Sequence, residues 1–287
     1  MRKVRIGVLK IGCTGCTPLL EYLFDERAER VDIEIRVFGC GAKMLEDEVK
    51  EVCELVIKSN PDLVIVVTPN ASLPVPLKAL NTISSTGAPT LVISDAPAKK
   101  AVNKFEAMNI GYLLVLADSM IGARREFLDP VEMAIYNSDI IKVLAITGAY
   151  NIIYEQVSKL VDALKKGEKP VLPQIIVDSE TAVNAAEFNN PYARAKAIAA
   201  YEIAKTVSKL TTVACFKIKE RERYISYAAA AHEMMRYAAH LAEEAREIEK
   251  YGDHVVRKPH SKEGEVLRKL KLLEKTKGGQ LNEPLKT

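Results

Sequence analysis

The sequence predicts an α/β protein that begins with an open, mainly parallel sheet carrying helices on both faces. Short runs rich in β-branched residues recur about every 30 residues, the length of a strand–helix–strand unit. Segments with helical spacing of apolar residues separate these runs. The run LVIVV is apolar without alternation, which is typical of a parallel strand buried on both faces.

Five strands are expected in the sheet domain, which we assign to residues 1–128. They are the segments Val4–Lys10, Ile33–Phe38, Leu63–Val67, Thr90–Ile93 and Tyr112–Leu116. Between the second and third strands, Met44–Ser59 places Val49, Val52 and Val56 near one helical face. Crossover helices of this kind keep consecutive strands parallel.

Residues 129–287 are expected to form a mainly helical part with a small β segment at about 171–220. Asp129, Pro130 and Glu132 stand in the order of a helix N-terminus, with an N-cap, a first-turn proline and a reciprocal acidic residue. A helix should therefore run from there to about Thr147.

The remaining elements of this part follow from the same signals. Helices are expected at Tyr150–Lys166, from Asn190-Pro191 onward and at 225–251, whereas QIIVD (174–178) and VACFKIK (213–219) have the composition of strands. The charged, lysine-rich tail beyond Pro259 is expected to be loosely held unless it contacts a partner chain.

The composition is that of a globular protein with an ordinary core. Of the 287 residues, 48% are hydrophobic and 28% are charged, and the net charge of +3 is too small to indicate nucleic-acid binding. No apolar run approaches the ~18 residues of a membrane span, and the N-terminus lacks the apolar centre of a signal peptide. Five cysteines, an odd number, argue against a secreted disulfide framework. We therefore expect a cytoplasmic protein.

Open parallel sheets bind ligands beyond the carboxyl ends of their strands. Small, polar and turn-forming residues occupy those ends here, in segments 10–17, 39–41, 68–72, 94–97 and 117–120. Backbone amides in such loops can approach an anionic or planar cofactor closely. A ligand site at this edge and ordinary βα loops are both consistent with the pattern. The sequence has no G-x-G-x-x-G or G-x-x-x-x-G-K-[ST], which argues against a standard dinucleotide or P-loop site.

Two local motifs suggest other chemistry. Cys13-Thr-Gly-Cys16 precedes a helix that starts near Pro18, where a helix N-terminus can lower a thiol pKa. In order of preference, these cysteines are small residues of a tight loop, a thiol redox pair, or half of a zinc site that no second C-x-x-C completes. His232-Glu233 resembles the start of a zincin motif, but Arg236 replaces its second histidine. No nucleophile or acid–base arrangement and no metal site is visible.

One long stretch carries a more specific resemblance. The run ADSMIGARREFLDPVEMAIYNSDIIKVLAITGAY, which begins at Ala117, resembles the signature stretch of archaeal methylenetetrahydromethanopterin dehydrogenases that use the deazaflavin coenzyme F420. Further similar segments lie at 19–44, 94–100, 190–204, 229–250 and 255–264. The resemblance implies an α/β sheet domain, a helical part and a small β segment, assembled as a homohexamer.

The same resemblance implies reversible hydride transfer in archaeal one-carbon metabolism, as in methanogenesis. Methylene-tetrahydromethanopterin would give its hydride to F420, leaving methenyl-tetrahydromethanopterin and reduced F420. Neither half-reaction needs a protein nucleophile or acid–base group, so the protein has to stack two rings and exclude water. F420 would be the cofactor, with no metal, nucleic acid or membrane involved.

Site residues follow from the same alignment of motifs. Those implied to bind the cofactor are Lys10, Gly12, Cys13, Thr14, Gly15, Thr17, Thr68, Pro69, Asn70, Ser94, Asp95, Ala96 and Pro97. Those implied to lie beside the pterin or at a subunit contact are Asp118, Met120, Arg124, Arg125, Glu126, Asp129, His232 and Glu233.

The presumed cofactor loops depart from the family pattern. The first loop usually reads Gly-Asn-x-Gly-Thr-Ser, but here it is Gly-Cys-Thr-Gly-Cys-Thr at 12–17. The usual Gly-Asp-Ala-Pro-Gly becomes Ser-Asp-Ala-Pro-Ala at 94–98. Lost glycines remove conformational freedom, and added side chains narrow a flat pocket. Two alternatives to a divergent dehydrogenase stay open: a paralogue that binds a pterin or deazaflavin without turnover, and a thiol redox protein using Cys13 and Cys16.

Overall fold

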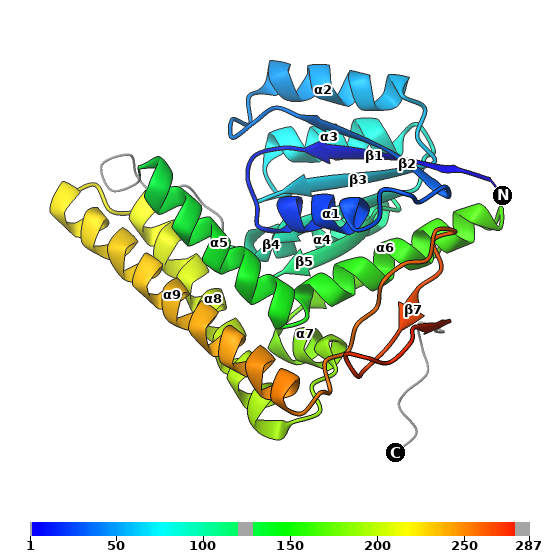
Figure 1. Cartoon of the computed structure of the whole chain (residues 1–287). Helices are drawn as coiled ribbons and strands as arrows, with labels where there is room; N and C mark the ends of the chain where they lie inside the picture. Colours follow the sequence, from blue (N-terminus) through cyan, green and yellow to red (C-terminus); the bar gives the residue numbers. More distant parts are fainter. Residues whose placement is uncertain (1, 120–128, 279–287) are drawn as a thin grey trace.

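A computed structural model describes residues 2–119 and 129–278 of the protein (Figure 1). Six parallel strands form the main sheet in the order β2-β1-β3-β4-β5-β6. The strands are β1 (Val4–Lys10), β2 (Ile33–Gly39), β3 (Leu63–Thr68), β4 (Thr90–Asp95), β5 (Gly111–Val115) and β6 (Gln174–Val177). The expected fold class and all five expected strands of the first part are confirmed, with boundaries within two residues.

Helices cover both faces of this sheet. The connections along the first part contain α1 (Cys16–Asp25), α2 (Glu46–Lys58), α3 (Pro74–Ser84), the 3-10 helix η1 (Ala96–Ala101) and α4 (Val102–Ala107). The position of β3 in the sheet explains why apolar and polar residues do not alternate along it. Leu63, Ile65 and Val67 pack into the core shared with α1, whereas Val64 and Val66 pack into the core shared with α2 and α3. Both faces of the strand are therefore apolar.

A second group of helices follows β5 in the chain and lies beside the sheet or, in part, against the face that α1 covers (Figure 1). It comprises α5 (Pro130–Ile146), α6 (Ala149–Lys165), α7 (Ser179–Ala186), α8 (Pro191–Phe216) and α9 (Arg221–Tyr251). The predicted start of α5 is confirmed, because Asp129 Oδ1 accepts the backbone N–H groups of Val131 and Glu132, each at 2.8 Å. Helices α8 and α9 lie side by side along most of their length, and buried alanines such as Ala200 and Ala242 allow this close approach.

Two expected strands need correction. The segment 213–219 is not a strand, because α8 continues to Phe216; Ala214 is buried and Val213 accepts the N–H groups of Lys217 and Ile218 that end the helix. Packing against α9 outweighs the strand preference of its Val and Phe residues.

Strand β6 is present as expected. However, it pairs with β5, so it extends the main sheet and does not form a separate β segment. The small antiparallel sheet is instead β7 (Leu267–Arg268) with β8 (Lys277–Gly278). The division of the chain at residue 128 stays a prediction.

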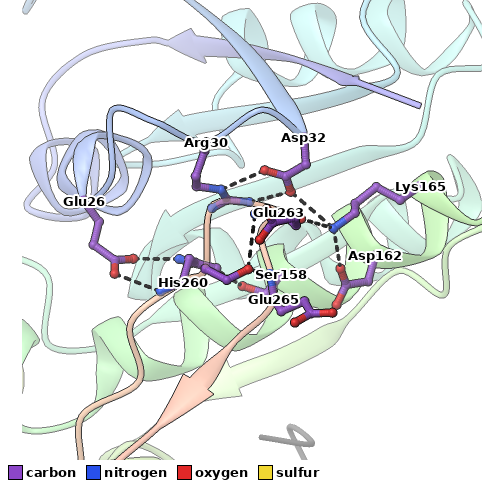
Figure 2. A network of polar contacts seen from close by, with 10 residues as sticks. Glu26, Arg30, Asp32, Ser158, Asp162, Lys165, His260, Glu263 and Glu265 are labelled. Carbon is purple, nitrogen blue, oxygen red and sulfur yellow. Dashed lines mark hydrogen bonds and ion pairs between the residues drawn. The ribbon is translucent and has the colours of Figure 1, made fainter. Parts of the chain in front are cut away.

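The expectation of a loosely held tail is wrong for the residues just beyond Pro259. His260 is only 1% exposed, and its Nδ1 lies 2.6 Å from Glu26 Oε2, at the end of α1 (Figure 2). Its Nε2 lies 3.2 Å from Ser158 Oγ on α6. Nearby, the buried Asp32 is held by Arg30 and Lys165 (Figure 2). These contacts fix the C-terminal segment against α1, α6 and the start of β2.

Candidate functional site

The carboxyl ends of the parallel strands share one edge of the sheet, and the predicted cofactor loops meet there (Figure 1). The loop after β1 lies against the loop after β3. Gly12 has φ +79°, and a Cβ at this position would lie 3.1 Å from Pro69 Cδ and 3.3 Å from Met44 Sδ. Gly12 is therefore required both by its backbone conformation and by the close approach of these loops.

Asp118 connects the end of β5 to the start of α1. Its carboxylate accepts the backbone N–H groups of Gly15 and Cys16, each at 2.8 Å, and the side chain is fully buried. A Cβ at Gly15 would lie 2.8 Å from Ile140 Cγ2, so the missing side chain allows α1 to approach α5. Asp118 thus satisfies the N-terminus of α1 and holds the first loop in place.

Two further predicted residues shape the loops after β3 and β4. Ser94 Oγ donates to the carbonyl oxygen of Thr68 at 2.7 Å and accepts the N–H of Ala71 at 3.1 Å. Asn70 Oδ1 accepts the N–H of Ser72 at 3.1 Å and its hydroxyl at 2.6 Å, an Asx turn. The hydrogen bonds of these two side chains are therefore made within the loops, and they fix the shape of the loops.

Thr68 and Asp95 differ from their neighbours. Thr68 Oγ1 and Asp95 Oδ1 are buried, and neither atom has a hydrogen-bond partner among the described residues. Burial, and next the negative charge of Asp118, raise the pKa of Asp95 well above its ordinary value. The protonated carboxyl that this favours can both donate and accept a hydrogen bond. An unmatched buried polar atom costs free energy, so each of these two atoms marks a position where a polar ligand group would be stabilised.

The other predicted cofactor residues line the same edge. Thr14 Oγ1 lies 3.2 Å from Thr17 Oγ1, and the carbonyl oxygen of Lys10 accepts the N–H of Cys40 at 3.3 Å. Ala96 and Pro97 open η1 directly after Asp95.

His232 on α9 belongs to a cluster that also includes residues from α5. Its Nδ1 lies 3.1 Å from Glu132 Oε1, and its ring stacks on Tyr136 with centroids 4.0 Å apart. The Tyr136 hydroxyl donates to the carbonyl oxygen of Ser119 at 3.2 Å, immediately after Asp118. Burial lowers the pKa of His232, although Glu132 acts in the opposite direction. The cluster connects the helical part to the loop after β5.

No sequence pattern predicted this cluster as a unit. Glu132 was expected to complete the N-cap of α5, but its carboxylate contacts His232 instead. Tyr136 was missed, although Glu132 and Tyr136 are four residues apart and so share a helical face. That spacing, inside the stretch that resembles the family signature, was the only available signal.

Several predicted substrate residues are not brought into this cluster. Glu233 is exposed and lies 4.0 Å from Arg236 on its own helix. Asp129 is exposed and caps α5. Met120, Arg124, Arg125 and Glu126 lie outside the described residues.

Cys16 does not have the environment of a reactive thiol. Cys16 is 1% exposed, and burial followed by the charge of Asp118 raises its pKa well above the ordinary value. The expected lowering by the helix N-terminus is therefore wrong for Cys16, because the carboxylate of Asp118 occupies that N-terminus. Within residues 2–119 and 129–278, no group of three or more His, Cys, Asp or Glu side chains is placed to hold a metal ion. No helix in these ranges is long and apolar enough to span a bilayer.

Comparison with known families accounts for this arrangement. The sequence model of the methylene-5,6,7,8-tetrahydromethanopterin dehydrogenase family matches residues 4–277. The chain belongs to this family. The resemblance seen in the sequence is thereby confirmed, and it covers both the sheet and the helical part of the dehydrogenase fold.

Individual relatives agree with the family match. An F420-dependent methylenetetrahydromethanopterin dehydrogenase of Archaeoglobus fulgidus is 53% identical over 272 residues, which cover 95% of this chain and 98% of that protein. The enzyme of the same name from Methanocaldococcus jannaschii is 48% identical over 273 residues, covering 95% and 99%. A solved F420-dependent methylene-tetrahydromethanopterin dehydrogenase, in complex with methylene-tetrahydromethanopterin and coenzyme F420, superposes with a TM-score of 0.93. It is 42% identical, and the match covers 96% of this chain and all of that one.

Proposed function

We propose that this member of the dehydrogenase family transfers a hydride reversibly between methylene-tetrahydromethanopterin and coenzyme F420. The observation that carries the proposal is the superposition, at a TM-score of 0.93 over 96% of the chain, on an enzyme solved with both molecules. Relatives with identities of 53% and 48% have the same enzyme name. The chain is accordingly an oxidoreductase.

The loops after β1, β3 and β4 are proposed to hold the deazaflavin. Their residues fit a planar polar molecule, because Thr68 Oγ1 and Asp95 Oδ1 are buried polar atoms without a partner among the described residues. Asp95, with its raised pKa, would donate a proton to a hydrogen bond or accept one from a ring N–H. Ser94 and Asn70 keep the two loops in the shape that presents these atoms.

The other side of the site is proposed to hold the pterin. Asp118 fixes the N-terminus of α1, and the cluster of Ser119, Tyr136, His232 and Glu132 places polar groups beside the same loop. His232 is buried and its lowered pKa favours the neutral ring, so it would act as a hydrogen-bond partner rather than as a cation. Met120, Arg124, Arg125 and Glu126 stay proposals from the resemblance, as does Glu233.

For this reaction the main task of the protein is to position the two bound rings. F420, when bound, supplies the carbon centre that accepts or gives the hydride. The chain's own residues have to orient the two rings at contact distance, keep water out and prevent competing protonation. Rigid loops suit this role, and Gly12 and Gly15 lie in close contacts that fix the first loop against its neighbours.

A homo-oligomer, a hexamer by resemblance, is proposed for the assembly, with the cytoplasm as its location. Helix α5 supports an interface, because it is apolar around much of its circumference yet exposes Val131, Met133 and Ile135. A helix of this kind in a soluble protein is usually covered on all sides. Sedimentation velocity would test the oligomer directly.

Anaerobic spectrophotometry tests the activity. Purified protein is mixed with oxidised F420 and methylene-tetrahydromethanopterin, and the visible band of the deazaflavin is followed together with the methenyl absorbance. The proposal expects bleaching of the first with a stoichiometric rise of the second. If no bleaching occurs under conditions where the Archaeoglobus fulgidus relative turns over, the protein is instead a paralogue that binds a pterin or deazaflavin without turnover.

A further inference from the structure

A second groove lies away from the proposed hydride-transfer site. It has a volume of about 610 Å³ and runs between the turn from α5 to α6 and the C-terminal segment. Ile146, Tyr150, Tyr154 and Val256 give it an apolar floor. Glu26, which follows the end of α1, also lines it. Since α1 begins at the carboxyl edge of the sheet, a residue beyond its other end lies on the far side of the domain.

Two cations lie side by side on the wall of the groove that the C-terminal segment forms. Arg257 and Lys269 form an isolated antiparallel bridge, with N–O distances of 2.9 and 3.0 Å in the two directions. Residues directly opposite in an antiparallel pair send their side chains to the same face. Like charges in that arrangement repel, and they are destabilising without a counter-charge.

A third cation reaches the groove from α9. Arg246 lines it together with Arg257 and Lys269. Partial burial, and then the charge of Arg257, lower the pKa of Arg246, while the charges of Glu247 and Glu249 act in the opposite direction. Arg246 therefore adds positive charge to a groove that the two bridged cations already line.

The nearby carboxylates are paired with groups other than Arg246, Arg257 and Lys269. Glu155 and Glu187 both pair with Lys258, a fourth cation that lines the groove, at 2.7 and 2.5 Å. Figure 2 shows the carboxylate of Glu26 turned to His260, whose N–H and Nδ1 it contacts at 2.9 and 2.6 Å.

The two acidic neighbours of Arg246 on α9 are engaged as well. Glu247 pairs with Lys250, and Glu249 accepts the N–H groups of Asn189 and Asn190. In the described part of the chain, the side chains of Arg257 and Lys269 contact only backbone carbonyls, and of the four cations that line the groove only Lys258 forms an ion pair.

We infer that this groove binds a small organic phosphate, whose anionic group is held by Arg246, Arg257 and Lys269 and whose organic part lies on Tyr150 and Tyr154. Arginine forks match phosphate oxygens in two-point contacts, and lysine adds a point charge. The volume lies within the range of sites for small molecules and cofactors. An anion there would relieve the repulsion between the opposed Arg257 and Lys269. The inference does not depend on the proposed hydride transfer.

Isothermal titration calorimetry of the full chain with phenyl phosphate and with inorganic phosphate tests the inference. Phenyl phosphate is expected to bind several times more tightly than inorganic phosphate, because only it can cover the apolar floor. Both should bind more weakly as sodium chloride is added. Arg257→Gln and Lys269→Gln are each expected to weaken phenyl phosphate about tenfold, the effect of losing one charge-assisted contact.

Lys104→Gln, which removes an exposed lysine of α4 with no ion pair in the described part of the chain, is the matched control and should leave both affinities unchanged. Thermal denaturation without phosphate checks that each variant is folded. Arg246→Gln provides a second, independent loss of charge from a different element. The inference is overturned if wild-type protein binds neither phosphate, or if folded Arg257→Gln, Lys269→Gln and Arg246→Gln bind phenyl phosphate as the wild type does.

Discussion

The two ends of the α/β sheet differ in how two buried carboxylates, those of Asp32 and Asp95, are matched. At the end where β2 begins and the C-terminal segment docks, buried charges are matched: Asp32 lies 2.9 Å from Arg30 and 3.4 Å from Lys165, and His260 lies 2.6 Å from Glu26 (Figure 2). At the carboxyl edge, Thr68 Oγ1 and Asp95 Oδ1 are buried and have no partner in the described part of the chain. Matched groups hold a structure together, whereas unmatched groups are a cost that a ligand can remove. The protein therefore stabilises its own chain at the first end, and at the carboxyl edge it presents unsatisfied polar atoms that a ligand can bind.

The largest effect is expected at Gly264, in the matched end. Its φ is +79°, and a Cβ there would lie 1.9 Å from Asp32 Oδ2. Gly264→Ala should lower the free energy of unfolding by about 4 kcal/mol, because left-handed strain adds to displacement of the Asp32 ion pairs. Gly87→Ala is the matched control: its φ is +81°, and nothing lies within 4 Å of its added Cβ. Its cost should be about 1 kcal/mol. Urea denaturation measures both, and equal costs would mean that the Asp32 contact is unimportant.

Loss of the Asp32 charge should come next in size. Asp32→Asn leaves Arg30 and Lys165 without their buried partner, so unfolding should become easier by about 3 kcal/mol at neutral pH. Glu46→Gln, which breaks an exposed pair with Lys78, should have no measurable effect. Similar stabilities of Asp32→Asn and wild type would show that the network of Figure 2 does not hold the segment.

The pH dependence of stability should have opposite signs at the two ends. Burial alone would raise the pKa of Asp32, but hydrogen bonds and the charges of Arg30 and Lys165 outweigh it and lower that pKa. Its contribution is therefore present above the unfolded pKa and lost as pH falls through the lowered folded value. The pKa of Asp95 is raised, so its contribution is present at acid pH and lost as pH rises through the folded value. Asp95→Asn should thus stabilise the protein in the neutral range, where Asp32→Asn destabilises it. Thermal denaturation across pH would contradict this if both variants shifted stability in the same direction.

A smaller effect is expected on ligand binding. Asp95→Ala should raise the Kd for F420 about tenfold, since a hydrogen bond of about 1.4 kcal/mol is lost. Thr68→Val should raise the Kd for F420 by a smaller factor. It should not lower the stability of the folded protein, because the Thr68 hydroxyl has no protein partner among the described residues. Asp47→Asn on the exposed start of α2 is the control. Fluorescence titration measures all three, and unchanged Kd values for Asp95→Ala and Thr68→Val would remove the carboxyl edge from the cofactor site.

The smallest effect is expected at Cys16. We expect its buried thiol, with a raised pKa, to play no part in hydride transfer, so Cys16→Ala should turn over F420 at the wild-type kcat. A large loss of kcat in a folded Cys16→Ala protein would instead favour the thiol redox alternative.

Local sequence signals predicted most elements because they depend on neighbours in the chain. Strand β3 and the N-cap Asp129 of α5 are of this kind: one is a burial pattern and the other a capping motif. The segment 213–219 was mispredicted because its Val and Phe residues favour a strand in isolation, while burial of Ala214 against its neighbours keeps α8 helical.

Only the part of the site that follows from the sheet topology could be predicted from the sequence. Parallel strands bring their carboxyl ends together, so the loops of Thr68 and Asp95 could be predicted to meet. The contact of His232 with Glu132 joins residues 100 apart on two helices, and nothing local in the sequence indicates it. Likewise, Asp118 anchors the start of α1 through hydrogen bonds to residues 103 and 102 positions earlier in the chain, and nothing local in the sequence indicates them.

Hydrogen–deuterium exchange with and without F420 tests the contrast between the two ends most directly. We expect F420 to slow amide exchange in the loops at 11–17, 69–73 and 95–101, and to leave 255–266 unchanged. Protection confined to 255–266, or no protection in the three loops at a saturating F420 concentration, would contradict the assignment of the carboxyl edge as the cofactor site.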